Sequence, residues 1–107
     1  MKFSAAQIAA ATGGRLIRGD VIGPVLTDTR EIKKGAWFLA IVGERFDAHQ
    51  FLDTAISEGA LGLIVDREVD VSEDIAIVQV VDTTRAFQAL GNAARTRLLG
   101  PVVALTG

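Results

Sequence analysis

The feature that most constrains the fold is an uninterrupted apolar run, Trp37-Phe38-Leu39-Ala40-Ile41-Val42. A strand with one solvated face would alternate with polar residues, so we expect residues 37–42 to form a central strand covered on both faces. Asp47 as N-cap and Gly59 as C-cap bracket apolar residues at helical spacing, namely Ala48, Phe51, Leu52, Ala55 and Ile56. Residues 61–65 follow as a second buried strand. This order predicts a layered α/β fold with a right-handed crossover.

The N-terminal segment predicts a capped helix. Ser4 and Gln7 have the spacing of a capping box, Phe3 and Ile8 have that of a hydrophobic staple, and Gly13-Gly14 ends the helix. The segment carries one lysine and a short apolar stretch, but this pattern fits a helix better than a secretory signal. We therefore expect a cytoplasmic protein.

Further short elements complete the predicted domain. We expect an edge strand at 15–18, strands at 24–28, 75–81 and 102–105, and an acidic connector at 66–74. A helix that begins at Asp82 or Thr83 and ends at Gly100-Pro101 should bury one face, formed by Phe87, Leu90, Ala94 and Leu98. The expected fold class is α/β, a small three-layer-like domain with a mixed sheet flanked by about three helices.

Composition narrows the possible functions. The 107 residues suffice for one hydrophobic core, and a net charge of −2 argues against a nucleic-acid-binding protein. The chain has no cysteine, so disulfides and thiolate chemistry are not available. A single histidine, His49, argues against a metal site held by this chain alone. No apolar run reaches the roughly 18–20 residues needed to span a membrane.

Two polar segments flank the central strand, and each has a functional and a structural interpretation. In the first, Thr27-Asp28-Thr29-Arg30, the threonine hydroxyls and the Arg30 guanidinium can bind a phosphate or a carboxylate. Alternatively, Asp28 accepts backbone N–H groups in an Asx-turn and Arg30 lies on the surface. The residues alone favour the second interpretation.

The second polar segment follows the carboxyl end of the strand, where ligands of α/β sheets usually bind. It reads Gly43-Glu44-Arg45-Phe46-Asp47-Ala48-His49. Phe46 can stack on a flat ring and Arg45 can pair with a phosphate; alternatively, Phe46 fills the core, and Glu44 and Arg45 are solvated. We expect Asp47 to cap the helix in either case. His49 has no serine or thiol partner, so it is expected to be structural or a ligand contact rather than a general base.

The remaining acidic residues do not suggest catalysis. Asp53, Glu58 and the acids between positions 66 and 74 show no paired-carboxylate pattern, and we interpret them as solvated. The sequence offers no set of nucleophile, base and oxyanion donors. The chain by itself is therefore expected to be catalytically inactive.

Over essentially its full length the chain resembles the N-terminal domain of the Mur ligases. The matching residues are TDTR at 27–30, KKGAWFLAIVGERFDAH at 33–49, GALGLIVDR at 59–67 and PVVALTG at 101–107. Mur ligases have an N-terminal domain that holds the UDP end of a nucleotide-sugar peptide, a central ATPase with a P-loop, and a C-terminal domain that helps to bind the incoming amino acid or dipeptide. The resemblance implies that residues 1–107 are the first domain and end at Gly107, the first glycine of the P-loop and of the ATP site.

The resemblance also implies roles for individual residues. Contacts with the UDP end are implied for Thr27, Asp28, Thr29, Arg30, Gly43, Glu44, Arg45, Phe46, Asp47 and His49. The loop at 43–49 resembles the family member that adds D-Ala-D-Ala to UDP-MurNAc-tripeptide more than the tripeptide-forming member. Trp37 departs from the common pattern, which should affect packing rather than binding.

The same resemblance implies the partners. ATP and Mg²⁺ would bind to the missing central domain of the parent enzyme, and this chain would hold no cofactor or metal. Besides UDP-MurNAc-tripeptide, the partners would be the missing central and C-terminal domains, with neither nucleic acid nor membrane, and the chain would be a monomer. Two alternatives stay open: the same domain of a diaminopimelate- or lysine-adding ligase, and a small α/β interaction module without a ligand.

Overall fold

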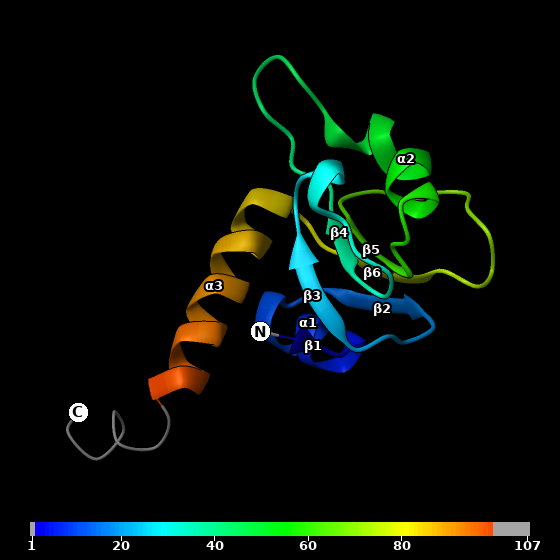
Figure 1. The fold of residues 1–107 in the computed structure, drawn as a ribbon. Helices are drawn as coiled ribbons and strands as arrows, with labels where there is room; N and C mark the ends of the chain where they lie inside the picture. Colours follow the sequence, from blue (N-terminus) through cyan, green and yellow to red (C-terminus); the bar gives the residue numbers. More distant parts are fainter. Residues whose placement is uncertain (1, 100–107) are drawn as a thin grey trace.

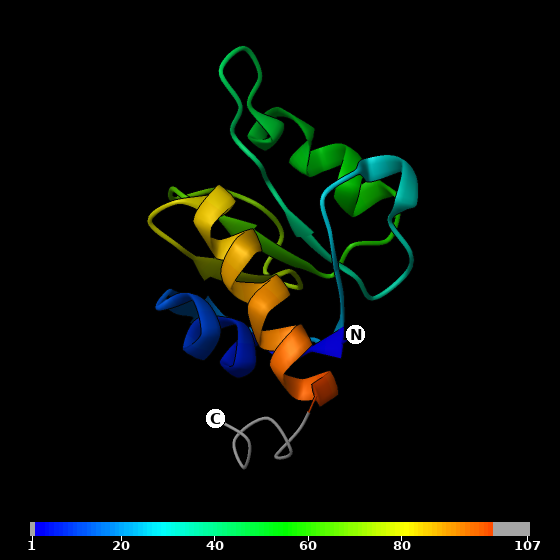
Figure 2. The ribbon, with the colours of Figure 1, turned by 90° about the vertical axis from the view of Figure 1, so that its left-hand side faces the viewer.

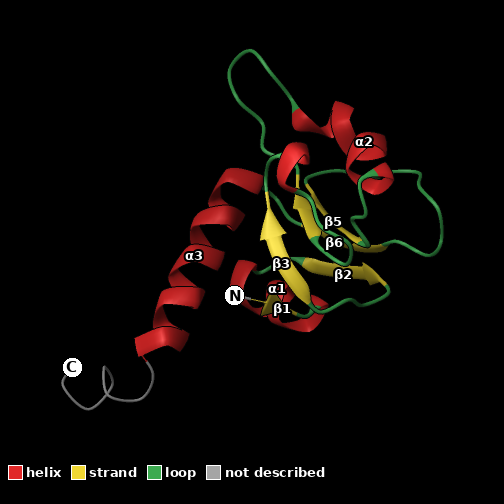
Figure 3. Cartoon of the chain, in the orientation of Figure 1, coloured by secondary structure: helices red, strands yellow, loops and turns green. Residues whose placement is uncertain are grey.

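The computed structural model describes residues 2–99, which form a six-stranded mixed sheet with helices on both faces (Figure 1, Figure 3). The strands are β1 Lys2–Phe3, β2 Arg15–Arg18, β3 Gly23–Leu26, β4 Trp37–Leu39, β5 Gly62–Val65 and β6 Ala76–Gln79. The helices are α1 Ala5–Thr12, α2 Leu52–Ser57 and α3 Thr83–Leu99, with two 3-10 turns, η1 Thr29–Glu31 and η2 Ala48–Phe51. The predicted fold class is confirmed.

The order of the strands places four chain segments at one edge of the sheet. The order is β1-β3-β4-β5-β6-β2, in which β3, β4, β5 and β6 are parallel and the two outer strands are antiparallel to their neighbours. Parallel strands end at the same edge, so the segments that follow β3, β4, β5 and β6 all leave from one side. Both polar segments of the sequence are among them.

Alternate residues of the central strands pack into two separate hydrophobic cores, one on each face of the sheet. Phe38, Leu63, Val65 and Ile77 face the layer that contains α2, whereas Trp37, Leu39, Ile64 and Val78 face α1 and α3. Figure 2 shows α1 and α3 together on one side of the sheet, and α2 lies on the other. Coverage on both faces is confirmed for residues 37–39 of the apolar run predicted over 37–42, whereas Val42 at its end is exposed.

Trp37 is the largest fully buried side chain, and its position is fixed by polar contacts. The indole Nε1 donates to the backbone oxygens of Phe3, at 3.1 Å, and Val21, at 3.0 Å. Gly62 is its register partner on β5, and the missing side chain there leaves room for the ring. Trp37 thus acts in packing, as expected.

The predicted ends of the first helix are confirmed, whereas the second helix has its C-cap at Glu58 instead of Gly59, and the predicted end of the last helix at Gly100-Pro101 lies outside the described residues. Ser4 and Gln7 form a capping box, and Gly13 has φ 71° at the end of α1. The helix expected between Asp47 and Gly59 is divided into η2 and α2. The strand expected at 37–42 ends at Leu39 because the chain then turns outward, returning as an antiparallel bridge between Val42 and Asp47.

Two predicted inward side chains are exposed. Phe87 lies on the solvent side of α3, because the helix turns Ala86 and Leu90 toward the sheet. Phe51 is also exposed and lies beside the outward turn after β4. The predictions for the side chain of Leu98, the strand at 102–105 and the P-loop glycine Gly107 lie outside the described residues. None of the described helices is both long and apolar enough to cross a membrane.

Candidate functional site

The two polar segments lie together at the carboxyl edge of the parallel strands. Residues 27–30 follow β3, and residues 43–49 follow β4, its neighbour in the sheet. A cavity of about 410 Å³, here called the turn cavity, is lined by Thr27, Asp28, Thr29, Arg30, Phe38, Phe46, Ala48 and Phe51. Both polar segments of the sequence therefore border one cavity.

The first segment is held by its own side chains. Asp28 Oδ1 accepts the backbone N–H of Arg30 at 2.9 Å, and its Oδ2 accepts from the Arg30 guanidinium at 2.7 Å. The side-chain hydrogen bond from Arg30, followed by its backbone N–H, lowers the pKa of Asp28 to about 2. Arg30 is 88% exposed, so the Asx-turn interpretation holds for this pair. Thr27 and Thr29 have no side-chain hydrogen bond to the described residues, which leaves their hydroxyls available in the turn cavity.

The second segment begins as a tight hairpin, residues 42–47, here called the hairpin arm. Gly43 N–H donates to the oxygen of Phe46 at 2.7 Å, and Ala48 N–H donates to the oxygen of Ile41 at 2.9 Å. A Cβ on Gly43 would lie 3.2 Å from the Phe46 ring, so glycine lets the ring fold back over the turn. In Figure 1 and Figure 2 the arm projects away from the sheet.

Phe46 is the aromatic element of the site. Its side chain is 48% exposed, and its ring centroid lies 6.4 Å from that of Phe51 at an interplanar angle of 40°. This exposure excludes the alternative in which Phe46 fills the core. The ring borders both the turn cavity and a second cavity of about 520 Å³, the arm cavity, which is lined by Arg45, Phe46, Asp47, His49, Gln50 and Arg67. Gly43 and Glu44 line neither cavity.

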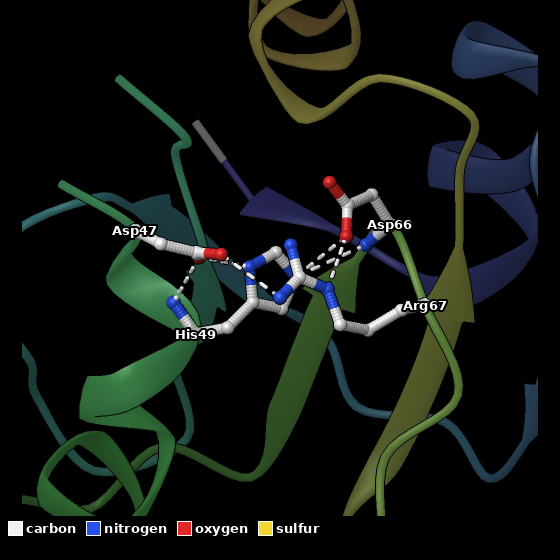
Figure 4. A network of polar contacts seen from close by, with 4 residues as sticks. All are labelled: Asp47, His49, Asp66 and Arg67. Carbon is white, nitrogen blue, oxygen red and sulfur yellow. Dashed lines mark hydrogen bonds and ion pairs between the residues drawn. The ribbon is translucent and has the colours of Figure 1, made fainter. Parts of the chain in front are cut away.

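A polar network fastens the base of the arm to the end of β5 (Figure 4). Asp47 Oδ1 accepts the backbone N–H of His49 at 2.9 Å and lies 2.6 Å from His49 Nδ1. Asp47 Oδ2 lies 2.8 Å from Arg67 Nη1, and Arg67 Nε donates to Asp66 Oδ1 at 2.6 Å. The backbone N–H of His49, helped by the His49 ring and Arg67, lowers the pKa of Asp47 to about 2.

His49 connects the two halves of this network. Its side chain is only 6% exposed, and its Nε2 accepts the backbone N–H of Asp66 at 3.2 Å while Nδ1 faces Asp47. Both ring nitrogens are therefore occupied by the protein. Of the two roles considered for His49, structural or ligand contact, this arrangement supports the structural one. Asp47 caps η2, as predicted.

Sequence reasoning missed Asp66 and Arg67. The interpretation of all acids between 66 and 74 as solvated is wrong for Asp66, which is partly buried and bonded to His49 and Arg67. The available signal was the position of the Asp66-Arg67 pair directly after the buried strand, at the edge where ligands of α/β sheets bind. Within residues 2–99, no cluster of three or more acidic, histidine or cysteine side chains is arranged to hold a metal ion.

Comparison with known proteins identifies the class. No protein-family model matches the chain. Curated relatives and solved structures are ligases named for UDP-N-acetylmuramoyl peptides, and the chain belongs to this Mur ligase family as an N-terminal domain.

Within the family the chain is similar to MurF. It is 41% identical over 102 residues to the UDP-N-acetylmuramoyl-tripeptide–D-alanyl-D-alanine ligase of Escherichia coli. The matched region covers 94% of this chain but only 22% of that protein. The crystal structure of MurF from Acinetobacter baumannii matches 85% of the chain with a TM-score of 0.72 and 35% identity. A 2,6-diaminopimelate-adding ligase of Clostridium perfringens is 40% identical over 65 residues, or 61% of the chain.

Proposed function

We propose that this domain binds the UDP end of UDP-MurNAc-tripeptide for a ligase that adds D-Ala-D-Ala. The observation that carries the proposal is the shared turn cavity, in which the residue 27–30 segment and the hairpin arm meet. A diphosphate nucleotide needs hydroxyl and cationic contacts beside a surface for a flat ring, and these groups surround the two adjoining cavities.

From the local contacts we assign some of these residues to contact the ligand and others to position them. Phe46 offers an exposed ring face for uracil, and the Thr27 and Thr29 hydroxyls can bond the ring or the diphosphate. Arg45 is exposed on the arm, and among the described residues it has no ion pair, so it is the better phosphate contact. Arg30 is already held by Asp28. Asp47 and His49 act by fixing the arm.

In the parent enzyme the chemistry would occur elsewhere. ATP would phosphorylate the terminal carboxylate of the tripeptide, and the amine of D-Ala-D-Ala would attack the acyl phosphate to form the amide and release phosphate. The central domain of the parent enzyme would hold ATP and Mg²⁺. This domain would hold the remote UDP end, so that binding energy far from the reacting carboxylate orients the substrate. On its own it would be inactive, monomeric and cytoplasmic.

The diaminopimelate-adding ligase is the second candidate, because one such relative is 40% identical to part of the chain. The MurF relative covers a larger share, 94% of the chain compared with 61%. We therefore favour the D-Ala-D-Ala-adding enzyme. Comparing UDP-MurNAc-tripeptide with UDP-MurNAc-dipeptide as substrates of the complete ligase separates the two candidates, since only the tripeptide should be extended.

Binding is tested by titrating the chain with UDP and with UDP-MurNAc-tripeptide while backbone amide shifts are followed. We expect shifts at residues 27–30 and 43–49, with weak affinity because one domain supplies one wall of the site. Amides in both segments that stay unmoved at millimolar ligand would refute the proposal. No ATP hydrolysis is expected from the isolated chain.

Arginine variants identify the phosphate contact. Arg45→Ala should weaken UDP binding about tenfold or more, the cost of a lost charge-assisted hydrogen bond. Arg30→Ala should weaken it less, because that guanidinium is engaged by Asp28. Arg95→Ala, an exposed position on α3, is the matched control for the loss of one positive charge. Equal affinities for the Arg45 and Arg95 variants would remove Arg45 from the site.

A further inference from the structure

An irregularity in the outer strand β2 brings two arginines to the same face of the sheet. In the pairing of β2 with β6, Arg15 lies opposite Gln79 and Leu16 opposite Val78, but Arg18 lies opposite Ile77. Ile17 is therefore an extra residue, a β-bulge. In a regular strand, residues three apart point to opposite faces. The bulge instead turns Arg15 and Arg18 toward one face.

These arginines line a cavity that is separate from the turn cavity. It has a volume of about 430 Å³, is here called the edge cavity, and is lined by Arg15, Ile17, Arg18, Arg67, Glu68, Val69, Ile77 and Gln79. It contains three arginines and one carboxylate, whereas the whole chain has a net charge of −2. The edge cavity is therefore lined by more positive than negative side chains, although the chain as a whole is acidic.

Arg18 is fixed in place without an acidic partner. Its Nε donates to the oxygen of Ile75 at 3.1 Å, and its Nη2 donates to the oxygens of Val71 and Ser72 at 2.9 and 2.6 Å. Within residues 2–99 no carboxylate forms an ion pair with Arg18 or with Arg15. The carbonyls hold the Arg18 guanidinium rigid but do not neutralise it, so its charge is available to an anion in the cavity.

Arg15 and Gln79 supply the adaptable part of the same site. They are direct register partners, and neither side chain forms a hydrogen bond with the described residues. Together they offer a guanidinium fork and an amide donor beside the fixed Arg18. A guanidinium fork matches the geometry of phosphate and carboxylate oxygens.

We propose that the edge cavity binds a small oxyanion, a phosphate or carboxylate group of a small molecule, at a site distinct from the nucleotide site. Arg15 and Gln79 contact the anion, and Arg18 provides a fixed positive charge. Arg67 borders both this cavity and the arm cavity, and it is already paired with Asp47 and Asp66. The decisive residues are therefore Arg15 and Gln79, which line only the edge cavity.

The test is a titration of the chain with inorganic pyrophosphate and, separately, with citrate at low ionic strength, where exposed charges are least screened. Backbone amides and the Gln79 side-chain amide are followed. We expect shifts at residues 15–18 and 79 with at least one of the probes. The stronger probe identifies a phosphorylated or a polycarboxylate ligand.

Two variants test the site independently. The fold should tolerate both substitutions, because the side chains of Arg15 and Gln79 form no hydrogen bonds with the described residues. Arg15→Gln should weaken binding of the better probe about tenfold. Gln79→Glu should abolish it, since the new carboxylate pairs with Arg15 and repels the anion. Arg95→Gln is the matched control and should leave the affinity unchanged.

Two results would overturn the proposed anion site. Shifts confined to residues 27–30 and 43–49 would overturn the edge site while supporting the nucleotide site. Equal weakening by Arg15→Gln and Arg95→Gln would show non-specific attraction and would also overturn it. Failure of UDP to bind would leave this proposal intact, because its decisive residues do not line the turn or arm cavities.

Discussion

Arg67 Nη1 lies 2.8 Å from Asp47 Oδ2, and this pair joins the loop after β5 to the hairpin arm after β4. The two side chains are 47% and 38% exposed, so water screens their attraction and the pair contributes little to global stability. Its effect is geometric. Asp47 also caps η2 and contacts His49, so the pair fixes where the arm leaves the sheet.

Arg67→Ala should therefore loosen the arm without unfolding the domain. We expect faster hydrogen exchange at the amides of residues 43–49, an almost unchanged denaturation midpoint, and weaker UDP binding. Arg67→Lys should have a smaller effect on amide exchange and UDP binding than Arg67→Ala, but should not restore the behaviour of the parent chain. An ammonium group cannot bridge Asp47 and Asp66 as the planar guanidinium does. Arg95→Ala is the control. Unchanged exchange in the arm would show that the pair does not position it.

The lowered pKa values of two carboxyl groups predict how the stability of the chain depends on pH in acid. The pKa values of Asp28 and Asp47 fall from 3.8 to about 2 in the folded chain. A group whose folded pKa is lowered stabilises the fold above its unfolded pKa, and that contribution is lost as the pH falls through the folded value. The stability of the chain should therefore decline between about pH 4 and pH 2.

Asparagine variants test this response. Asp28→Asn with Asp47→Asn should flatten the decline in denaturant-measured stability between pH 4 and pH 2, because the amide oxygen still caps the turn but no longer titrates. Glu73→Gln, at an exposed position without a hydrogen bond to the described residues, should leave the slope unchanged. If the stability of the double variant declines with pH as steeply as that of the parent chain, Asp28 and Asp47 are not the groups that cause the decline.

Features set by local chemistry were predictable from the sequence. Ser4, Gln7 and Gly13 specify the ends of α1 through capping bonds within a few residues, and Asp47 does the same for η2. The uninterrupted apolar run from Trp37 correctly indicated a strand covered on both faces. The second polar segment was correctly placed after the carboxyl end of that strand, where it borders the turn cavity.

Features set by long-range pairing were not predictable in the same way. The bulge at Ile17 depends on the register between β2 and β6, which are far apart in the chain. The contact of Arg67 with Asp47 depends on how two separate loops leave the sheet. Phe87 and Leu90 fit one helical stripe in the sequence, but the packing of α3 against α1 decides which part is buried.

Two glycines predict opposite effects on stability. A Cβ at Gly62 would lie 2.6 Å from Trp37 Cδ2 in the core, so Gly62→Ala should destabilise the chain by about 1–3 kcal/mol or more. Gly91 lies in α3, where an added Cβ meets no atom within 4 Å, so Gly91→Ala should stabilise it by about 0.5–1 kcal/mol. Urea denaturation measures both. A neutral Gly62→Ala would show that the indole can move aside.

Phe46 predicts a binding effect that is separable from stability. Its exposed ring borders both cavities, and stacking of a base on an aromatic side chain contributes about 1–3 kcal/mol. Phe46→Leu should therefore weaken UDP binding by about that amount while the denaturation midpoint stays nearly constant, and Phe46→Tyr should retain the affinity. Phe87→Leu is the matched control, because Phe87 is an exposed phenylalanine on α3 that lines neither cavity. Affinity that is equal in the Phe46→Leu and Phe87→Leu variants would show that the ring is not the uracil platform.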